Sequence, residues 1–195
     1  LMGIPIPESL GGAGMDTVAY AATVMELARA DASVAITMAA HTSLWTMPIV
    51  IAGSEEQKKK FVPPLASGEM IGAFGLTEPD AGSDAGATKT TAVKKGDEYI
   101  LNGGKIFITN VGEAGILNLT ARVIEGDEDK GIGAFIIETN TPGLIIKPKE
   151  KKMGWCASDT RQIFFEDMAV PAKNMLGTPR IGFKTFLKTL TGGRI

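Results

Sequence analysis

A change in hydrophobic period near residue 70 constrains the fold of this chain more than any other feature. Between residues 71 and 178, short apolar or β-branched runs alternate with turn residues such as Gly96-Asp97 and Pro142-Gly143. Short strands at this spacing are typical of an antiparallel barrel or sandwich. Asn102-Gly103, between two such runs, predicts a hairpin turn. The predicted strands are residues 71–76, 88–94, 98–101, 105–109, 116–123, 132–138, 144–148 and 161–166.

Residues 1–70 follow a helical period instead. Apolar residues spaced three to four apart follow both Asp16 and Asp31. Each of these Asp side chains can accept hydrogen bonds from the free N–H groups at the start of a helix. Ser54 and Gln57 have the spacing of a capping box, and Pro63-Pro64 interrupts the helical pattern that follows them.

Helical spacing returns at residues 181–190. The order helices, strands, helices differs from the alternating strands and helices of a doubly wound fold. We therefore predict an α+β fold with three parts: an N-terminal helical domain at 1–70, a middle antiparallel β-barrel at 71–178, and the start of a C-terminal helical domain at 179–195. We expect both ends to be cut from a longer protein.

Composition excludes several classes of function. The 20 Lys and Arg residues balance 22 Asp and Glu, so a nucleic-acid binder with a concentrated basic face is excluded. One cysteine and one histidine leave no intrachain disulfide, Cys-rich zinc site or multi-His metal site. The longest apolar stretch, residues 44–52, is shorter than the ~20 residues of a membrane span. No export signal precedes it, so we expect no membrane partner and a cytoplasmic location.

Two short motifs are weak indications of a ligand. Gly12-Ala13-Gly14 is followed by Thr17, where a dinucleotide-binding motif needs its third glycine, and no apolar strand precedes it. Residues 80–84 resemble a calcium loop but lack its closing glutamate. We predict neither a Rossmann site nor a calcium site.

We interpret the remaining polar candidates as structural. His41 lies among Ala, Thr and Trp on a predicted helix, which favours a packed or surface histidine over a catalytic one. Cys156 has no histidine partner nearby in sequence and is interpreted as a structural thiol. The opposite-sign charge clusters at residues 125–129 and 147–152 are interpreted as solvated loop faces.

The stretch from Ala73 to Asp84 carries the most functional information. A predicted strand ends at Thr77 and continues into a loop of small residues that contains Gly82 and Ser83. Such a loop exposes backbone N–H groups and hydroxyls, and it can surround a flat polar heterocycle or a pyrophosphate. The residues alone leave an ordinary strand-exit loop equally open.

The same stretch resembles a known family. Leu76-Thr77-Glu78-Pro79 with Gly82-Ser83-Asp84 is similar to the first signature of the acyl-CoA dehydrogenases, and residues 105–110, Lys-Ile-Phe-Ile-Thr-Asn, resemble that family's flavin-flanking strand. The chain is identified as a member, similar to the short-chain or butyryl-CoA dehydrogenases, because further matches follow in the same order over essentially its whole length. They are Pro5, Glu8, Gly11, Gly12, Gly14, Thr141-Pro142-Gly143, Phe165-Glu166-Asp167, Val170-Pro171 and Gly182-Phe183-Lys184.

The resemblance implies an FAD cofactor and places residues around its ring. Phe74, Leu76 and Thr77 would lie along the isoalloxazine. Ile108 and Thr109 would lie on the flavin-flanking strand, with Thr109 near flavin N5. These positions match the family's motifs residue by residue.

The resemblance also assigns the outer parts of the site. Phe107 would cover one face of the flavin, where many relatives have Trp, and Phe keeps the apolar contact without the indole N–H. Gly82 and Ser83 would contact the FAD pyrophosphate, and Ser83 would also reach the CoA. Arg194 matches an arginine near the CoA end of the substrate. Thr191 replaces an acidic residue found in many members, and Trp155-Cys156 stands where many have Arg.

The implied reaction is dehydrogenation of the Cα–Cβ bond of an acyl-CoA, giving a trans-2-enoyl-CoA and reduced flavin. A carboxylate base removes the α-proton while the β-hydrogen leaves as hydride. Gly193 occupies the place where one branch of the family has its glutamate. We therefore predict no catalytic Asp or Glu in this chain and expect the base beyond Ile195.

The resemblance further implies partners and a setting. These are an acyl-CoA substrate, electron-transfer flavoprotein as electron acceptor, a homotetramer or dimer, and a role in fatty-acid β-oxidation, in the mitochondrial matrix if the source is eukaryotic. Two alternatives stay open. One is a flavin monooxygenase on the same scaffold, and the other is a non-catalytic flavin- or CoA-binding subunit.

Overall fold

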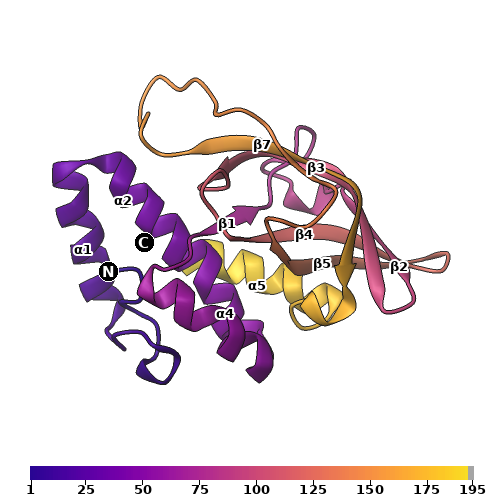
Figure 1. Cartoon of the computed structure of the whole chain (residues 1–195), viewed down its shortest axis with the longest axis horizontal. Helices are drawn as coiled ribbons and strands as arrows, with labels where there is room; N and C mark the ends of the chain where they lie inside the picture. Colours follow the sequence, from indigo (N-terminus) through magenta and orange to yellow (C-terminus); the bar gives the residue numbers. More distant parts are fainter. Residues whose placement is uncertain (193–195) are drawn as a thin grey trace.

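The computed structural model describes residues 1–192, and its helices gather on one side of a seven-stranded sheet (Figure 1). The N-terminal helices are α1 (Thr17–Ala30), α2 (Ala32–Ala39), the π-helical segment η2 (Ala40–Thr46), α3 (Met47–Ala52) and α4 (Glu55–Ser67), preceded by the 3-10 turn η1 (Glu8–Leu10). The C-terminal helix α5 (Pro179–Gly192) lies against β5 (Glu128–Glu138) and α3.

The predicted helix starts are confirmed. Asp16 Oδ1 accepts from Ala19 N at 2.8 Å, and Asp31 Oδ1 accepts from Ser33 N at 2.6 Å. Ser54 and Gln57 form both hydrogen bonds of the capping box. These side chains pair N–H groups that a helix start leaves without a partner.

The interruption expected at Pro63-Pro64 is wrong, because α4 continues through both prolines to Ser67. A proline inside a helix costs ~3 kcal/mol relative to alanine. Packing of the helix outweighs that cost, since Phe61, Val62 and Leu65 are almost completely buried around the two prolines.

α2, η2 and α3 form one continuous helix of 21 residues, Ala32–Ala52. Among the described residues it is the one helix long and apolar enough to cross a membrane by length and composition. The expectation that no such stretch exists is therefore wrong, because the helix extends well before the apolar run at 44–52. Its contacts are those of a core helix. Trp45 is fully buried, and its Nε1 donates to Ile116 O at 2.9 Å. Because Gly72 has no side chain, the Trp45 ring can lie against its backbone.

The strands are β1 (Gly72–Gly75), β2 (Thr91–Lys95), β3 (Glu98–Thr109), β4 (Ile116–Glu125), β5, β6 (Leu144–Ile146) and β7 (Thr160–Pro171). Two 3-10 turns, η3 (Ala85–Ala87) and η4 (Ala172–Asn174), complete the elements. The sheet order is β1-β4-β2-β3-β7-β6. β1 and β2 pair with successive parts of one edge of β4, and β5 pairs with its other edge.

The α+β class is confirmed, but the prediction of a wholly antiparallel barrel is wrong. β4 runs parallel to both β1 and β2, whereas the other pairs are antiparallel. The cause is the pairing of β3 with β7. Because β7 takes that edge of β3, β4 reverses direction and joins the far edge of β2, which makes the pair parallel.

The hairpin predicted at Asn102-Gly103 is also wrong, since β3 continues through it with a bulge between Leu101 and Gly103. Gly103 has φ +140°, and a Cβ there would lie 2.7 Å from Thr90 Oγ1, so this glycine allows β3 to approach the residue just before β2 closely. The turn between β2 and β3 is at Gly96-Asp97.

A single buried hydrophobic cluster runs through both regions, with Trp45 and Leu65 from the helices and Leu117 and Phe135 from the sheet. The boundaries at residues 70 and 178 stay a prediction, and this cluster spans both of them, because it also contains Phe186 of α5.

Candidate functional site

A cavity of about 190 Å³ opens where the ends of β1 and β3 meet η2 and α5. Six of the eight residues predicted to bind flavin line it: Phe74, Leu76, Thr77, Phe107, Ile108 and Thr109. The remaining lining residues are Ala40, Leu44, Gly72 and Leu190. The walls are therefore mostly apolar, with two threonine hydroxyl groups at the strand ends.

A bulge in β3 shapes one wall of this cavity. The pairing of β3 with β7 shifts between Lys105 and Ile108, and Phe107 takes a left-handed backbone conformation with φ +58°. The Phe107 side chain is 65% exposed, whereas the neighbouring Ile108 side chain is buried in the core. Bulges turn single side chains out of a sheet, and a left-handed non-glycine residue often marks a functional site.

β1 supplies the opposite wall. Phe74 stacks on Phe186 of α5, with ring centroids 4.3 Å apart. Beyond β1, Ile106 N donates to Thr77 O at 2.8 Å, which joins the exit of β1 to the bulged part of β3. The two walls are therefore held to each other by the backbone as well as by packing.

His41 fixes the beginning of β1. Its Nδ1 accepts from Gly72 N at 3.0 Å, and its Nε2 lies 3.0 Å from Leu65 O. A ring that accepts at Nδ1 and donates at Nε2 is the neutral tautomer. Burial lowers the pKa of His41, although the hydrogen bond to Leu65 opposes this shift. The interpretation of His41 as a packed residue is confirmed.

A buried ion pair lies directly behind the cavity, and sequence reasoning missed its role. Lys105 Nζ is 2.7 Å from Glu78 Oε1, and the two side chains are 0% and 5% exposed. The ammonium group also donates to Leu76 O at 3.2 Å, and to the Thr88 and Thr120 hydroxyls. The feature of the sequence that indicated this pair was Lys105, a charged residue at the start of the mostly apolar run predicted as a strand at 105–109.

The surroundings keep both members of the pair charged near neutral pH. Burial alone would raise the pKa of Glu78, but the Lys105 charge and hydrogen bonds from Lys105, Thr88 and Lys89 lower it to about 2. Burial lowers the pKa of Lys105 to about 8, against the opposing effect of Glu78. Glu78 is therefore an acceptor committed to its neighbours, and its carboxylate is not free to act as a base.

The other predicted site residues lie apart from the cavity. Gly82 and Ser83 occupy an exposed loop between Glu78 and η3 and do not line it. Arg194 and Gly193 lie outside the described residues. Within residues 1–192, no group of three or more His, Cys, Asp or Glu side chains could hold a metal ion.

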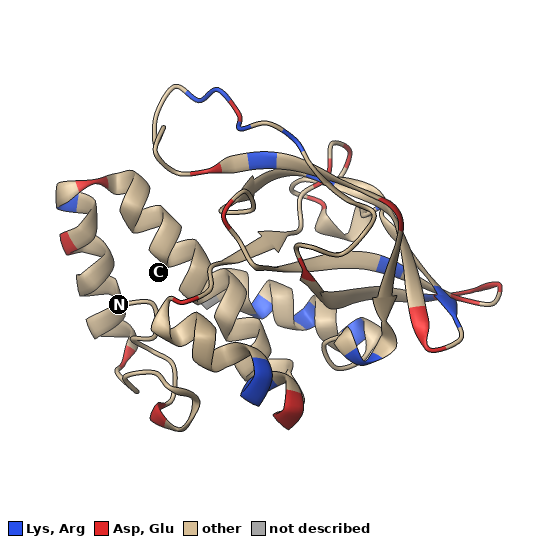
Figure 2. Ribbon diagram, viewed as in Figure 1, with Lys and Arg blue, Asp and Glu red and all other residues tan. Residues whose placement is uncertain are grey.

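Cys156 is exposed and free, so it does not pack in the core, and its interpretation as a structural rather than a reactive thiol stays a prediction. Its Sγ lies 3.3 Å from Lys152 O in the long connection between β6 and β7. In Figure 2 the ribbon of this connection carries several positions coloured blue for Lys and Arg, and both colours of charge mark the ribbon around the β4–β5 turn. The cluster at residues 147–152 lies on a loop, as predicted, whereas the cluster at 125–129 forms the tip of the β4–β5 hairpin, with only Gly126-Asp127 outside the strands.

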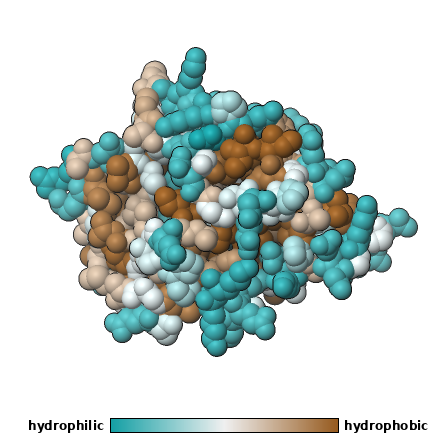
Figure 3. Space-filling view, viewed as in Figure 1, coloured by the Kyte–Doolittle hydropathy of each residue, from teal (hydrophilic) through white to brown (hydrophobic). Residues whose placement is uncertain are grey.

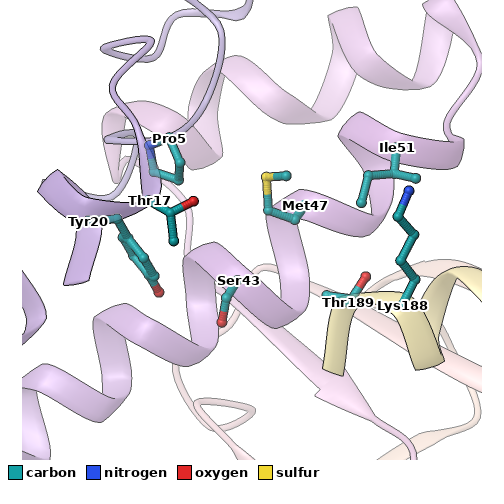
Figure 4. Close-up of a pocket in the computed structure, with 8 residues that line it drawn as sticks. All are labelled: Pro5, Thr17, Tyr20, Ser43, Met47, Ile51, Lys188 and Thr189. Carbon is teal, nitrogen blue, oxygen red and sulfur yellow. The ribbon is translucent and has the colours of Figure 1, made fainter. Parts of the chain in front are cut away.

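A second cavity, of about 220 Å³, lies between α1, η2, α3 and α5 (Figure 4). Tyr20 borders it, and its hydroxyl donates to Ala39 O at 3.0 Å. The cavity is lined by Pro5, Thr17, Tyr20, Ser43, Met47, Ile51, Lys188 and Thr189. Hydrophobic residues also reach the surface over α1 and α2, where Val18, Met25 and Val34 are exposed (Figure 3).

Comparison with protein families gives two matches. Residues 1–69 match the N-terminal domain of acyl-CoA dehydrogenases, and residues 73–168 match the middle domain. Among curated proteins, the chain is 48% identical over 195 residues both to an acyl-CoA dehydrogenase of Bacillus subtilis and to a short-chain specific acyl-CoA dehydrogenase of Clostridium acetobutylicum. Each match covers 100% of this chain and 52% of the relative, so the chain spans about half the length of these proteins.

Solved structures agree with these matches. Butyryl-CoA dehydrogenase from Megasphaera elsdenii superimposes with a TM-score of 0.93 at 48% identity, covering 99% of this chain and 51% of that one. An acyl-CoA dehydrogenase of Bacillus anthracis complexed with FAD gives 0.93 at 42% identity, covering 99% and 33%. A chain from a study of the electron transferring flavoprotein of Acidaminococcus fermentans gives 0.94 at 48% identity, covering 99% and 51%.

Proposed function

The chain belongs to the acyl-CoA dehydrogenase family, and from this membership we propose that it forms the flavin cradle of an FAD-dependent acyl-CoA dehydrogenase. The proposed reaction converts the Cα–Cβ bond of an acyl-CoA thioester into that of a trans-2-enoyl-CoA. The observation that carries the proposal is the convergence of Thr77, Phe107 and Thr109 on one apolar cavity. Thr77 follows the end of β1, whereas Phe107 and Thr109 lie in β3, and residues 78–97 separate the two segments in the chain.

The cavity fits the ring of a flavin. A flat heterocycle with polar edges needs apolar walls and a few hydroxyl or N–H groups, and the walls here carry Thr77 and Thr109 among aromatic and aliphatic side chains. Sites for whole small molecules usually measure ~300–1,000 Å³. A cavity of about 190 Å³ therefore suits the ring alone, with the rest of the cofactor outside it.

Each side chain has a specific task in this proposal. Phe107, exposed on its bulge, covers the ring and excludes water. The hydroxyls of Thr77 and Thr109 hydrogen-bond the polar edge of the ring. When bound, FAD supplies the electron sink that accepts the β-hydrogen as hydride. Gly82 and Ser83, in their exposed loop, offer backbone N–H groups and a hydroxyl to the pyrophosphate.

The proton-abstracting base is proposed to come from outside residues 1–192. Among these residues, none that lines the cavity is an Asp or Glu. Glu78 is an acidic residue directly next in sequence to a lining residue, Thr77. Its carboxylate, however, is held by Lys105, Thr88 and two backbone N–H groups. A carboxylate with that many partners is a weak base.

The finer assignments follow the family. We propose a short-chain acyl-CoA substrate, because the Clostridium acetobutylicum relative is described as short-chain specific. The Acidaminococcus fermentans study of an electron transferring flavoprotein supports such a protein as electron acceptor. A homotetramer or dimer that contacts CoA through Arg194, acting in β-oxidation in the cytoplasm or mitochondrial matrix, completes the proposal.

The test is anaerobic addition of butyryl-CoA or octanoyl-CoA to the complete, FAD-loaded protein. We expect the flavin absorption band to bleach, faster with butyryl-CoA. Absence of bleaching with either compound contradicts dehydrogenation and favours a non-catalytic flavin- or CoA-binding subunit. Rapid reoxidation of the reduced flavin by air, together with hydroxylation of the substrate, favours a monooxygenase instead.

A further inference from the structure

The two walls of the cavity converge on one buried pair of charges. On the β3 side, Lys105 is two residues before Phe107 and four before Thr109, which line the cavity. On the β1 side, Glu78 directly follows Leu76 and Thr77, which also line it. The Glu78–Lys105 contact, at 2.7 Å, therefore joins the two lining segments at their base.

Three consecutive residues at the exit of β1 are tied down by this arrangement. Leu76 O accepts from Lys105 Nζ at 3.2 Å, and Thr77 O accepts from Ile106 N at 2.8 Å. The next side chain, Glu78, accepts from Lys105 and from the backbone N–H groups of Lys89 and Thr90. Thr77 therefore lies between two neighbours that Lys105 contacts, the Leu76 carbonyl and the Glu78 carboxylate. The Thr77 carbonyl itself is held by Ile106, the residue after Lys105.

The pair costs more than a stable fold requires. Burying two charges is expensive, and well-packed apolar residues of similar volume often give equal or greater stability. Lys60 and Glu138 show the ordinary alternative: the same two residue types at 2.8 Å, joining α4 to β5, with side chains 62% and 45% exposed. A pair buried behind a ligand cavity therefore calls for a role beyond stability.

We propose that Glu78 and Lys105 are positioning residues that hold Leu76–Thr77 and Phe107–Thr109 in register for the flavin ring. Neither side chain lines the cavity. Each acts through the lining residue beside it, by fixing the Leu76 carbonyl or the loop that follows Thr77. This inference rests on the proposed flavin site.

The experiment uses the double variant Glu78→Gln/Lys105→Met in the complete protein. Removing both charges leaves no unpaired buried ion, so the free energy of unfolding of the apoprotein is expected to stay near that of the wild type. FAD affinity is expected to fall at least about tenfold, since the hydrogen bonds that fix Leu76 O and the loop after Thr77 are weakened or lost. The visible absorption band of the flavin that still binds is expected to shift. The matched control is Lys60→Met/Glu138→Gln, which removes the exposed pair and is expected to leave FAD affinity and spectrum unchanged.

The outcomes separate this inference from the proposed site. If the double variant binds FAD with wild-type affinity and spectrum, the positioning role is wrong. If the wild-type protein itself does not bind FAD, the proposed function fails instead. Should the double variant not fold, Glu78→Asp decides: it keeps the charge but shortens the side chain, so weaker FAD binding supports the inference and unchanged binding overturns it.

Discussion

Lys105–Glu78 and Lys60–Glu138 each join distant segments of this chain, and the two pairs differ sharply in burial. Lys105–Glu78 lies beneath the cavity with both side chains almost fully buried, and Lys60–Glu138 lies on the surface between α4 and β5. The distances between the charged atoms are nearly equal, at 2.7 and 2.8 Å. In the buried pair each charge depends on the other, whereas water can replace either partner of the exposed pair.

The largest expected effect comes from breaking the buried pair on one side only. Lys105→Met leaves the Glu78 carboxylate buried without its counter-charge, which is expected to lower the free energy of unfolding by ~3–5 kcal/mol. Lys60→Met, the matched change on the surface, is expected to cost at most ~1 kcal/mol. Urea unfolding of both variants measures the difference. Equal losses in the two variants would remove the contrast between the pairs.

Lowering the pH tests the buried pair through the charge of Glu78. The pKa of Glu78 is lowered to about 2 in the folded state, so its contribution to stability is fully present above its ordinary pKa of 4.5. That contribution, about 3 kcal/mol by linkage, is lost as the pH falls from about 4.5 through 2. The stability of wild type and Glu78→Gln, measured by urea unfolding at several pH values, is therefore expected to converge over this range. A constant difference between them would show that the Glu78 carboxylate is not the titrating group.

A third variant changes Phe107, which lies on the exposed side of the cavity. Phe107 is largely exposed, so Phe107→Ala is expected to change protein stability little while weakening FAD binding. The lost aromatic contact is worth ~1 kcal/mol beyond area burial. FAD titration of the complete protein measures it, with Met153→Ala, another exposed apolar residue, as the control. Unchanged FAD affinity in Phe107→Ala would contradict its placement over the ring.

The smallest effects are expected at the hydroxyls. Thr77→Val and Thr109→Val keep the side-chain shape and each delete one hydrogen-bonding group, worth ~0.5–1.5 kcal/mol. Flavin reduction by acyl-CoA is expected to slow in both variants, with little loss of stability. Stopped-flow bleaching and the flavin reduction potential report on this. A normal reduction rate and potential in Thr109→Val would refute its assignment to flavin N5.

Local patterns in the sequence predicted local structure well. Asp16, Asp31 and Ser54 begin their helices because a side-chain oxygen must pair the free N–H groups, and that requirement is visible in a few residues. The turn at Gly96-Asp97 is local in the same way.

Features that depend on distant partners were not predictable. β4 runs parallel to β2 because β7 occupies β3, and Pro63 and Pro64 remain helical because the helix around them packs into the core. The Glu78–Lys105 pair joins residues 27 positions apart in the chain. The cavity residues were found by resemblance to a family, since nothing in the spacing of Phe107 predicts the bulge that turns its ring outward.

The flavin site is best tested by an experimental structure of the complete protein with FAD. We expect the isoalloxazine ring in the cavity between Thr77, Phe107 and Thr109, with the buried Glu78–Lys105 pair intact. A ring bound elsewhere, for example in the cavity beside Tyr20 and Met47, would contradict both the proposed site and the positioning role of the pair.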